Sequence, residues 1–113
     1  MVLMKKPKVL SFIHQTPYIE ENCEVFHAYS IEEGLRILGA YNIDLIISNQ
    51  PNSYNKEFII DKYIDYPVLV IDDNHQEEPF IDLGINHRQA KKDFKKYVAD
   101  ILELRREKRS KAA

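Results

Sequence analysis

Short apolar runs alternate along the chain with stretches whose apolar residues recur at helical spacing. The runs predict buried strands over residues 8–14, 24–29, 43–48 and 67–71, with a short edge strand over 79–84. Strands that alternate with helices favour a parallel sheet covered on both faces. We therefore predict one three-layer α/β domain with a mainly parallel sheet of about five strands.

Two capping boxes mark where helices begin. In Ser30-Ile-Glu-Glu33 and Asn86-His-Arg-Gln89, the first side chain can bind the fourth amide and the fourth side chain can return to the first amide. Thr16 is a further candidate cap, but only a turn or two of helix fits after it. A third helix is predicted over 56–64. The positions predicted to face the core are Ile31, Leu35 and Leu38; Phe58, Ile59 and Tyr63; and Ala90, Phe94, Tyr97, Val98, Ile101 and Leu102.

Composition is that of an ordinary globular chain. Of 113 residues, 44% are hydrophobic and 30% are charged, which fits a folded domain. No apolar run approaches the roughly 18 residues that a membrane span needs, so no membrane partner is expected. The N-terminus lacks a signal-peptide pattern and Cys23 is the only cysteine. We therefore expect a cytoplasmic protein.

Charge is distributed unevenly. Residues 1–86 carry 6 basic and 14 acidic residues, whereas residues 87–113 carry 10 basic and 4 acidic ones. An acidic body thus precedes a long basic helix, a pattern that can mark an interaction surface. We place the body at residues 1–104 and a basic helical extension or linker at 105–113.

The central elements resemble the receiver domains of response regulators. Residues 24–51 combine a strand, a helix that starts Ser-x-x-Glu, and the strand Asp44-Leu-Ile-Ile-Ser-Asn-Gln-Pro51, followed by a helix and Pro67-Val-Leu-Val-Ile71. The resemblance covers about residues 8–104 in element order. It implies a flavodoxin-like (CheY-like) fold, here with a shortened first helix and a shortened fourth-helix region.

The resemblance also implies that the phosphorylation machinery is degenerate. Receivers use two acidic residues after the first strand, an acceptor Asp after the third, a Thr or Ser after the fourth and a Lys after the fifth. Here the acidic pair aligns with Ile13-His14 or with His14-Gln15, the acceptor with Asn49 and the Thr/Ser with Asp72, and residues 79–84 contain no Lys. An amide is no phosphoryl acceptor. We predict a pseudo-receiver with no catalytic residue.

The ends of the strands suggest an alternative role. The carboxyl edge of a parallel sheet is the usual ligand site, and His14, Asn49, Asp72 and Asp73 are predicted to meet there. They could form a small metal- or ligand-binding sensor, or the two aspartates could simply cap turns. The three glycines, Gly34, Gly39 and Gly84, form no phosphate-binding loop, so no cofactor is predicted.

Our main expectation is a regulatory module that acts through protein contact. The predicted interaction surface runs from residues 75–85 onto the last helix and includes Phe80, Phe94, Tyr97 and Ile101. The partner would be another protein or a second copy, and the chain could be the regulatory domain of a larger regulator. A nucleic-acid-binding adaptor that uses the basic helix, or an attached output domain, is the other alternative.

Overall fold

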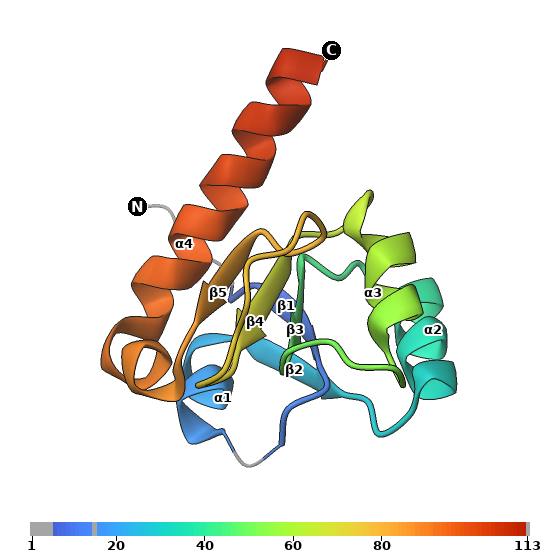
Figure 1. Cartoon of the computed structure of the whole chain (residues 1–113), viewed down its shortest axis with the longest axis horizontal. Coiled ribbons are helices and arrows are strands. Elements are labelled where there is room, and N and C mark those ends of the chain that lie inside the picture. Colours follow the sequence, from blue (N-terminus) through green and yellow to red (C-terminus); the bar gives the residue numbers. More distant parts are fainter. Residues whose placement is uncertain (1–5, 15, 113) are drawn as a thin grey trace.

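The computed structural model describes residues 6–14 and 16–112, with side chains as far as Arg105 in the last helix. Five strands form one parallel sheet in the order β2-β1-β3-β4-β5 (Figure 1). The strands are β1 (Lys8–Ser11), β2 (Glu24–His27), β3 (Leu45–Ser48), β4 (Val68–Ile71) and β5 (Leu83–Ile85). The predicted α/β architecture is confirmed, and the sheet is parallel throughout.

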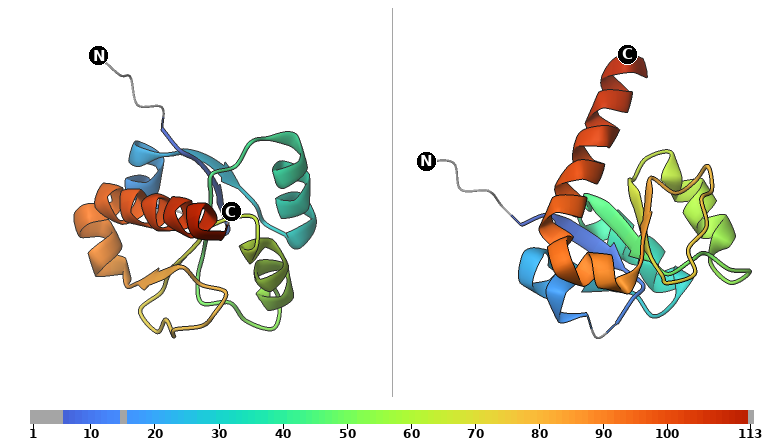
Figure 2. Two further views of the ribbon diagram at one scale, coloured as in Figure 1. Left: turned by 90° about the horizontal axis from the view of Figure 1, so that it is seen from above. Right: turned by 60° about the vertical axis from the view of Figure 1, so that its left-hand side comes forward.

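Helices cover both faces of the sheet (Figures 1 and 2). The four helices are α1 (Pro17–Asn22), α2 (Ile31–Ala40), α3 (Lys56–Tyr63) and α4 (His87–Ala112). Successive side chains of a strand point to opposite faces. Val9 and Leu45 pack on the face of α1 and α4, whereas Leu10 and Ile46 pack on the face of α2 and α3. Every residue of β3 and β4 is buried, as expected for central strands covered on both sides.

The two predicted caps form, but to different extents. At the start of α4, the Gln89 amide donates to Asn86 Oδ1 at 2.7 Å and the Asn86 amide donates to Gln89 Oε1 at 3.0 Å. At the start of α2, the Glu33 amide donates to Ser30 Oγ at 3.1 Å. The Thr16 cap is wrong, because its side chain makes no capping hydrogen bond and its hydroxyl is buried. The helix α1 is nevertheless short, as predicted.

Gly34, rather than Leu35, faces the core from α2. Leu35 is 47% exposed, so its predicted inward position is wrong. Three residues after Ile31, helical spacing brings Gly34 against the sheet, where an added Cβ would lie 3.0 Å from the Phe12 ring and 3.4 Å from the Phe58 ring. These two rings meet edge to face, with centroids 5.5 Å apart. The missing side chain at position 34 therefore makes room for this aromatic pair.

The segment between β4 and β5 is a loop, without a helix. The predicted edge strand over 79–84 is displaced, since the strand runs only from Leu83 to Ile85. A turn precedes it, in which the Ile81 amide donates to the Glu78 carbonyl at 3.0 Å. This turn places Phe80 in the core on the α2 and α3 side. The chain joins the sheet only after this turn, at Leu83.

The last helix bends and then leaves the body. Asp93 has φ −151° and ψ 52° inside α4, so the helix consists of two segments that run in different directions (Figure 2). The second segment packs Phe94, Val98 and Ile101 on the sheet and then continues past it (Figure 1). In the part of the chain that the structure describes, no helix has the length and apolar character needed to cross a membrane.

Candidate functional site at the carboxyl edge of the sheet

The loops after β3 and β4 are joined by three hydrogen bonds. Asn49 Nδ2 donates to the Ile71 carbonyl at 3.1 Å, and the Gln50 amide donates to Asp72 Oδ2 at 3.0 Å. Gln50 Oε1 in turn accepts from the Gln76 amide at 2.8 Å. The groups aligned with the receiver's acceptor and its Thr/Ser therefore bind the protein's own backbone.

Both aspartates after β4 act as local caps. Asp72 Oδ1 accepts from the Asn74 amide at 2.9 Å, and Asp73 Oδ1 accepts from the His87 amide at 3.1 Å at the start of α4. The hydrogen bonds from the amides of Asn74 and Gln50 hold the pKa of Asp72 below its usual value; burial opposes this effect, and His87 and His75 add to it. Asp72 therefore stays ionised to a lower pH than an ordinary aspartate.

His14 lies in a different group, on the β2 side of the edge. Its ring stacks on Tyr29, with centroids 4.2 Å apart and planes 4° apart, and lies 5.3 Å from the His27 ring. His27 Nε2 is 3.2 Å from Glu20 Oε1. Tyr29 is 71% exposed, so the stack reaches the surface. The pairing of His27 with His14 was not predicted, because nothing local in the sequence shows that β2 lies beside β1.

The four residues predicted to converge thus form no single site. Asn49 and Asp72 lie in one hydrogen-bonded network, Asp73 caps α4, and His14 packs with His27 and Tyr29. Among the residues described, no group of three or more His, Cys, Asp or Glu side chains is arranged to hold a metal ion. The alternative alignment of the acidic pair involves Gln15, which lies outside the described residues.

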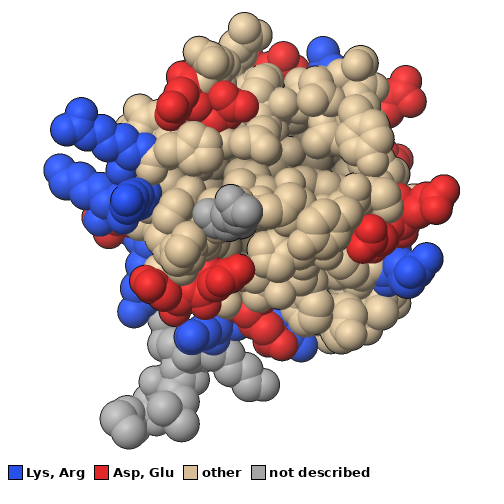
Figure 3. Space-filling view, turned by 90° about the horizontal axis from the view of Figure 1, so that it is seen from below, with Lys and Arg blue, Asp and Glu red and all other residues tan. Residues whose placement is uncertain are grey.

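The carboxyl edge is also not strongly charged. Figure 3 views the molecule from the side on which the strands end. The centre of this face carries neither basic nor acidic side chains, and the charged groups lie around its margin, with basic ones gathered on one side. Mg²⁺ prefers carboxylate oxygens, and the acidic side chains visible on this face lie at its margin.

The loop between β4 and β5 encloses an open cavity of about 480 Å³. It is lined by residues 75–84 with the exception of Phe80, whose side chain points into the core. Lys56 lies over the Phe80 ring at 5.8 Å and approaches Glu78 at 4.0 Å, which links the loop to α3. The loop that joins β4 to β5 thus surrounds a hollow and contains no helix.

Most of the predicted interaction surface is buried. Phe94 and Ile101 are 3% and 1% exposed in the core beneath α4, and Phe80 is buried on the opposite face of the sheet. Tyr97, on α4, is partly buried against the same core. Phe94 and Ile101 belong to the apolar stripe that anchors α4, and Phe80 packs on the other face of the sheet, so these three buried side chains are not exposed to a partner. Exposed residues of the 75–85 segment, such as Glu77, remain candidates.

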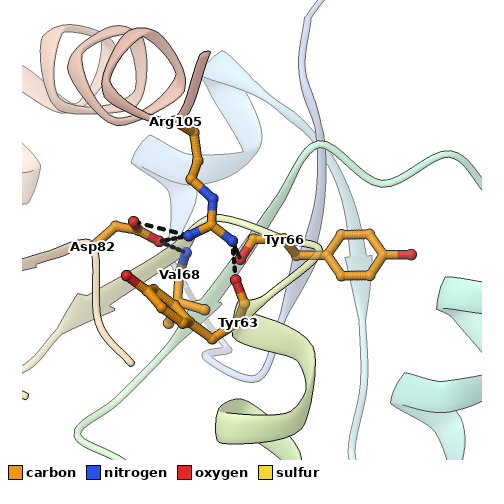
Figure 4. Close-up of polar contacts among 5 residues, drawn as sticks. All are labelled: Tyr63, Tyr66, Val68, Asp82 and Arg105. Atoms are coloured by element: carbon orange, nitrogen blue, oxygen red, sulfur yellow. Dashed lines mark hydrogen bonds and ion pairs between the residues drawn. The ribbon is translucent and has the colours of Figure 1, made fainter. Parts of the chain in front are cut away.

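Arg105 holds the end of the packed body together. Its guanidinium donates to both Asp82 oxygens, at 3.2 and 3.3 Å, and to the carbonyls of Tyr63 and Tyr66 (Figure 4). It also lies 4.6 Å from the Tyr63 ring centre. Arg105 was predicted to lie in the basic extension, and in the structure its side chain is buried against the body. The side chains of residues 106–113 lie outside those described.

Comparisons with known proteins do not extend this picture. No protein-family model matches the chain, and neither a curated protein nor a solved structure gives a significant match.

Proposed function

We propose that this chain is a receiver-like regulatory module that works by protein contact and without phosphoryl transfer. The observation that carries the proposal is the network after β3 and β4. Asn49 donates to Ile71, and Asp72 accepts from Gln50 and Asn74. The side chains at the positions that would hold Mg²⁺ and accept a phosphoryl group in a working receiver make hydrogen bonds to the protein backbone here.

An NMR titration tests the first half of the proposal. Amide spectra of the whole chain would be recorded with Mg²⁺ and then with beryllofluoride, a mimic of the phosphoryl group. We expect no saturable shifts at Asn49, Gln50 and Asp72, since breaking their hydrogen bonds costs more than a weak ion contact returns. Saturable shifts that cluster on these residues would refute phosphorylation independence.

The contact surface we propose is the loop that lines the cavity, residues 75–84. Its exposed members include Gln76, Glu77 and Pro79, and the hollow between them can receive a side chain of a partner. The partner would be another protein or a second copy of this chain. We place this activity in the cytoplasm, because the only cysteine, Cys23, is buried as a free thiol.

Sedimentation velocity over a range of concentrations tests self-association. If a dimer forms, Glu77→Arg is expected to weaken it, whereas Glu32→Arg, the same change at an exposed position on α2, leaves it unchanged. If the chain stays monomeric, the same two variants serve to test a captured protein partner. Equal effects of the two substitutions would show that the loop is not the contact surface.

Exposed lysines on α4 support nucleic-acid binding as an alternative function. Lys91, Lys92, Lys95 and Lys96 are all exposed. Binding through them would weaken steeply as salt is raised, because each phosphate contact releases a counterion. Fluorescence anisotropy with a labelled duplex at two salt concentrations separates this alternative from protein contact.

A further inference from the structure

Buried polar atoms without a protein partner gather at one corner of the molecule. Within the described residues, the buried side-chain atoms that lack a hydrogen bond are His14 Nδ1, Thr16 Oγ1, Tyr18 Oη and His27 Nδ1. His14 and Thr16 belong to the connection between β1 and α1, Tyr18 lies in the first turn of α1, and His27 ends the neighbouring strand β2. Unpaired buried polar groups are costly and uncommon, so a local group of them points to a functional role.

This corner coincides with the place where open parallel sheets bind ligands. In the order β2-β1-β3-β4-β5, the chain moves from β1 to one side and then returns to build β3 on the other. The connection that follows β1 therefore lies at the topological switch point, outside the carboxyl ends of the strands. His14 lies in this connection and His27 ends the neighbouring strand β2, so both imidazoles lie at the carboxyl edge of the sheet.

The hydrogen bond of His27 fixes which of its nitrogens is free to bind. Glu20 Oε1 lies 3.2 Å from Nε2, and a carboxylate can only accept, so Nε2 carries the proton. The neutral ring then presents a bare lone pair at Nδ1. A carboxylate that holds the distal N–H of an imidazole is the usual support of a metal-ligating histidine, because it fixes the tautomer and raises ligand basicity.

The ring of His14 is oriented by stacking on an aromatic side chain. Its ring lies parallel to Tyr29, with centroids 4.2 Å apart, and its Nδ1 is the second buried nitrogen without a partner among the described residues. The His14 and His27 ring centres are 5.3 Å apart. Two imidazoles bound to one tetrahedral ion have ring centres roughly 5 Å apart, given metal–nitrogen bonds of about 2.0–2.1 Å.

We propose that His14 and His27 together bind a divalent transition-metal ion of the Zn²⁺ class through their Nδ1 atoms. Glu20 acts as a positioning residue that orients His27. Because no third His, Cys, Asp or Glu of the described chain joins them, two coordination positions remain for water or a small ligand. Imidazole nitrogen suits Zn²⁺, Co²⁺ or Ni²⁺ and not Mg²⁺. This site keeps His14 of the predicted strand-end group but not Asn49, Asp72 or Asp73.

Titration of the whole chain with Zn²⁺, after treatment with a chelator, tests the proposal. We expect one equivalent to bind and the ¹⁵N resonances of His14 Nδ1 and His27 Nδ1 to shift. Co²⁺ should give visible absorption of the intensity typical of a tetrahedral ion. His14→Ala and His27→Ala are each expected to weaken binding at least tenfold, and His87→Ala, an exposed histidine at the start of α4, to leave it unchanged.

The variant Glu20→Gln distinguishes a role of Glu20 in orienting His27 from a general loss of stability. This variant keeps a hydrogen-bond acceptor for His27 but loses the negative charge, so we expect about tenfold weaker binding with an unchanged melting temperature of the metal-free protein. No saturable binding, or binding that persists in both His14→Ala and His27→Ala, overturns the proposal. If His27→Ala does not fold, the imidazole ¹⁵N shifts of the wild type decide: shifts at His75 or His87 instead would overturn it.

Discussion

Arg105 and Asp82 form a buried ion pair between the last helix and the segment that precedes β5. The Arg105 side chain is 10% exposed and that of Asp82 0%, and Asp82 Oδ2 also accepts from the Val68 amide at 2.8 Å. A single guanidinium thus joins α4, the loop before β5 and the end of α3. Because the backbone carbonyls of Tyr63 and Tyr66 complete its hydrogen bonds, the charge is well solvated by the protein.

Removal of this cation should be among the most damaging single changes in the chain. We expect Arg105→Ala to lower the free energy of unfolding by about 3–5 kcal/mol, because it leaves a carboxylate in the interior without its counter-charge. Urea denaturation followed by circular dichroism measures the loss. Lys96→Ala, which removes an exposed cation from the same helix, should change stability by less than about 0.5 kcal/mol.

Arg105→Lys distinguishes geometry from charge. A lysine retains the cation but cannot contact the Asp82 carboxylate and two carbonyls at once, so we expect it to recover only part of the lost stability. If Arg105→Lys recovered all of the stability that Arg105→Ala loses, the several hydrogen bonds of the guanidinium would be unimportant. Equal losses for Arg105→Ala and Lys96→Ala would contradict the buried pair itself.

Asn49→Asp should not restore phosphorylation. The substitution replaces the amide that donates to the Ile71 carbonyl with a carboxylate that repels this oxygen and lies close to the ionised Asp72. We therefore expect Asn49→Asp to lower the free energy of unfolding by about 1–3 kcal/mol. Acetyl phosphate and mass spectrometry test for an acyl phosphate. Asn52→Asp is the matched control, because its Oδ1 only accepts from the Tyr54 amide and an aspartate can do the same. A phosphorylated Asn49→Asp variant would contradict the claim that several groups of the phosphorylation machinery are missing.

The contribution of Asp72 should depend on pH. Its pKa is lowered by the amides of Asn74 and Gln50, so the ionised form stabilises the fold above the unfolded-state pKa, and this stabilisation is lost as pH falls through the lower folded-state pKa. Asp72→Asn keeps only one acceptor oxygen for the two amides that donate to this side chain. The substitution should therefore lower the free energy of unfolding by about 1–2 kcal/mol near neutral pH.

Urea denaturation of wild type and Asp72→Asn at neutral pH and at about pH 2.5 tests this dependence. The difference between the two free energies of unfolding should narrow as pH falls toward the lowered folded-state pKa of Asp72, because protonation removes the charge of the wild-type carboxylate. Asp73→Asn provides the comparison, since its single bond from the His87 amide survives the change. A difference that is constant with pH would mean that ionisation of Asp72 does not contribute.

The features that the sequence predicted well are those set by local rules. The run over residues 45–47 is apolar and, with Ser48, becomes a central strand. The predicted capping box forms both of its hydrogen bonds, between Asn86 and Gln89. Leu35 was misplaced because helical spacing admits two phases, and only the close approach of Phe12 and Phe58 selects Gly34. Strand boundaries and helix faces therefore follow from periodicity, but their exact phase follows from tertiary contact.

Side-chain partners across the fold were beyond sequence reasoning. Arg105 and Asp82 are 23 positions apart, and nothing in the basic tail distinguishes Arg105 from its neighbours. His14 was grouped with Asp72 because both follow strands, whereas the sheet order puts it beside β2 and His27. Strand order decides which ends are neighbours, and a single sequence indicates that order only through a resemblance.

Cys23 should be unreactive in the folded protein. It is 3% exposed, and burial raises the pKa of its thiol to about 11, with Lys6 opposing the shift. Since the thiolate is the nucleophile, both the low access and the raised pKa slow reaction with a disulfide reagent at about pH 8. We expect one thiol to react rapidly in urea and very slowly in buffer.

The rate of that slow reaction reports how often the core around Cys23 opens. Cys23 lies between α1 and β2 and packs in the same cluster as Ile19 and Phe94, so Phe94→Leu should accelerate labelling by loosening the contact between α1 and α4. An equivalent change on the opposite face, Phe58→Leu, should accelerate it less unless the whole domain unfolds, because Phe58 packs across the sheet. Equal acceleration by both would mean that Cys23 is exposed only by global unfolding.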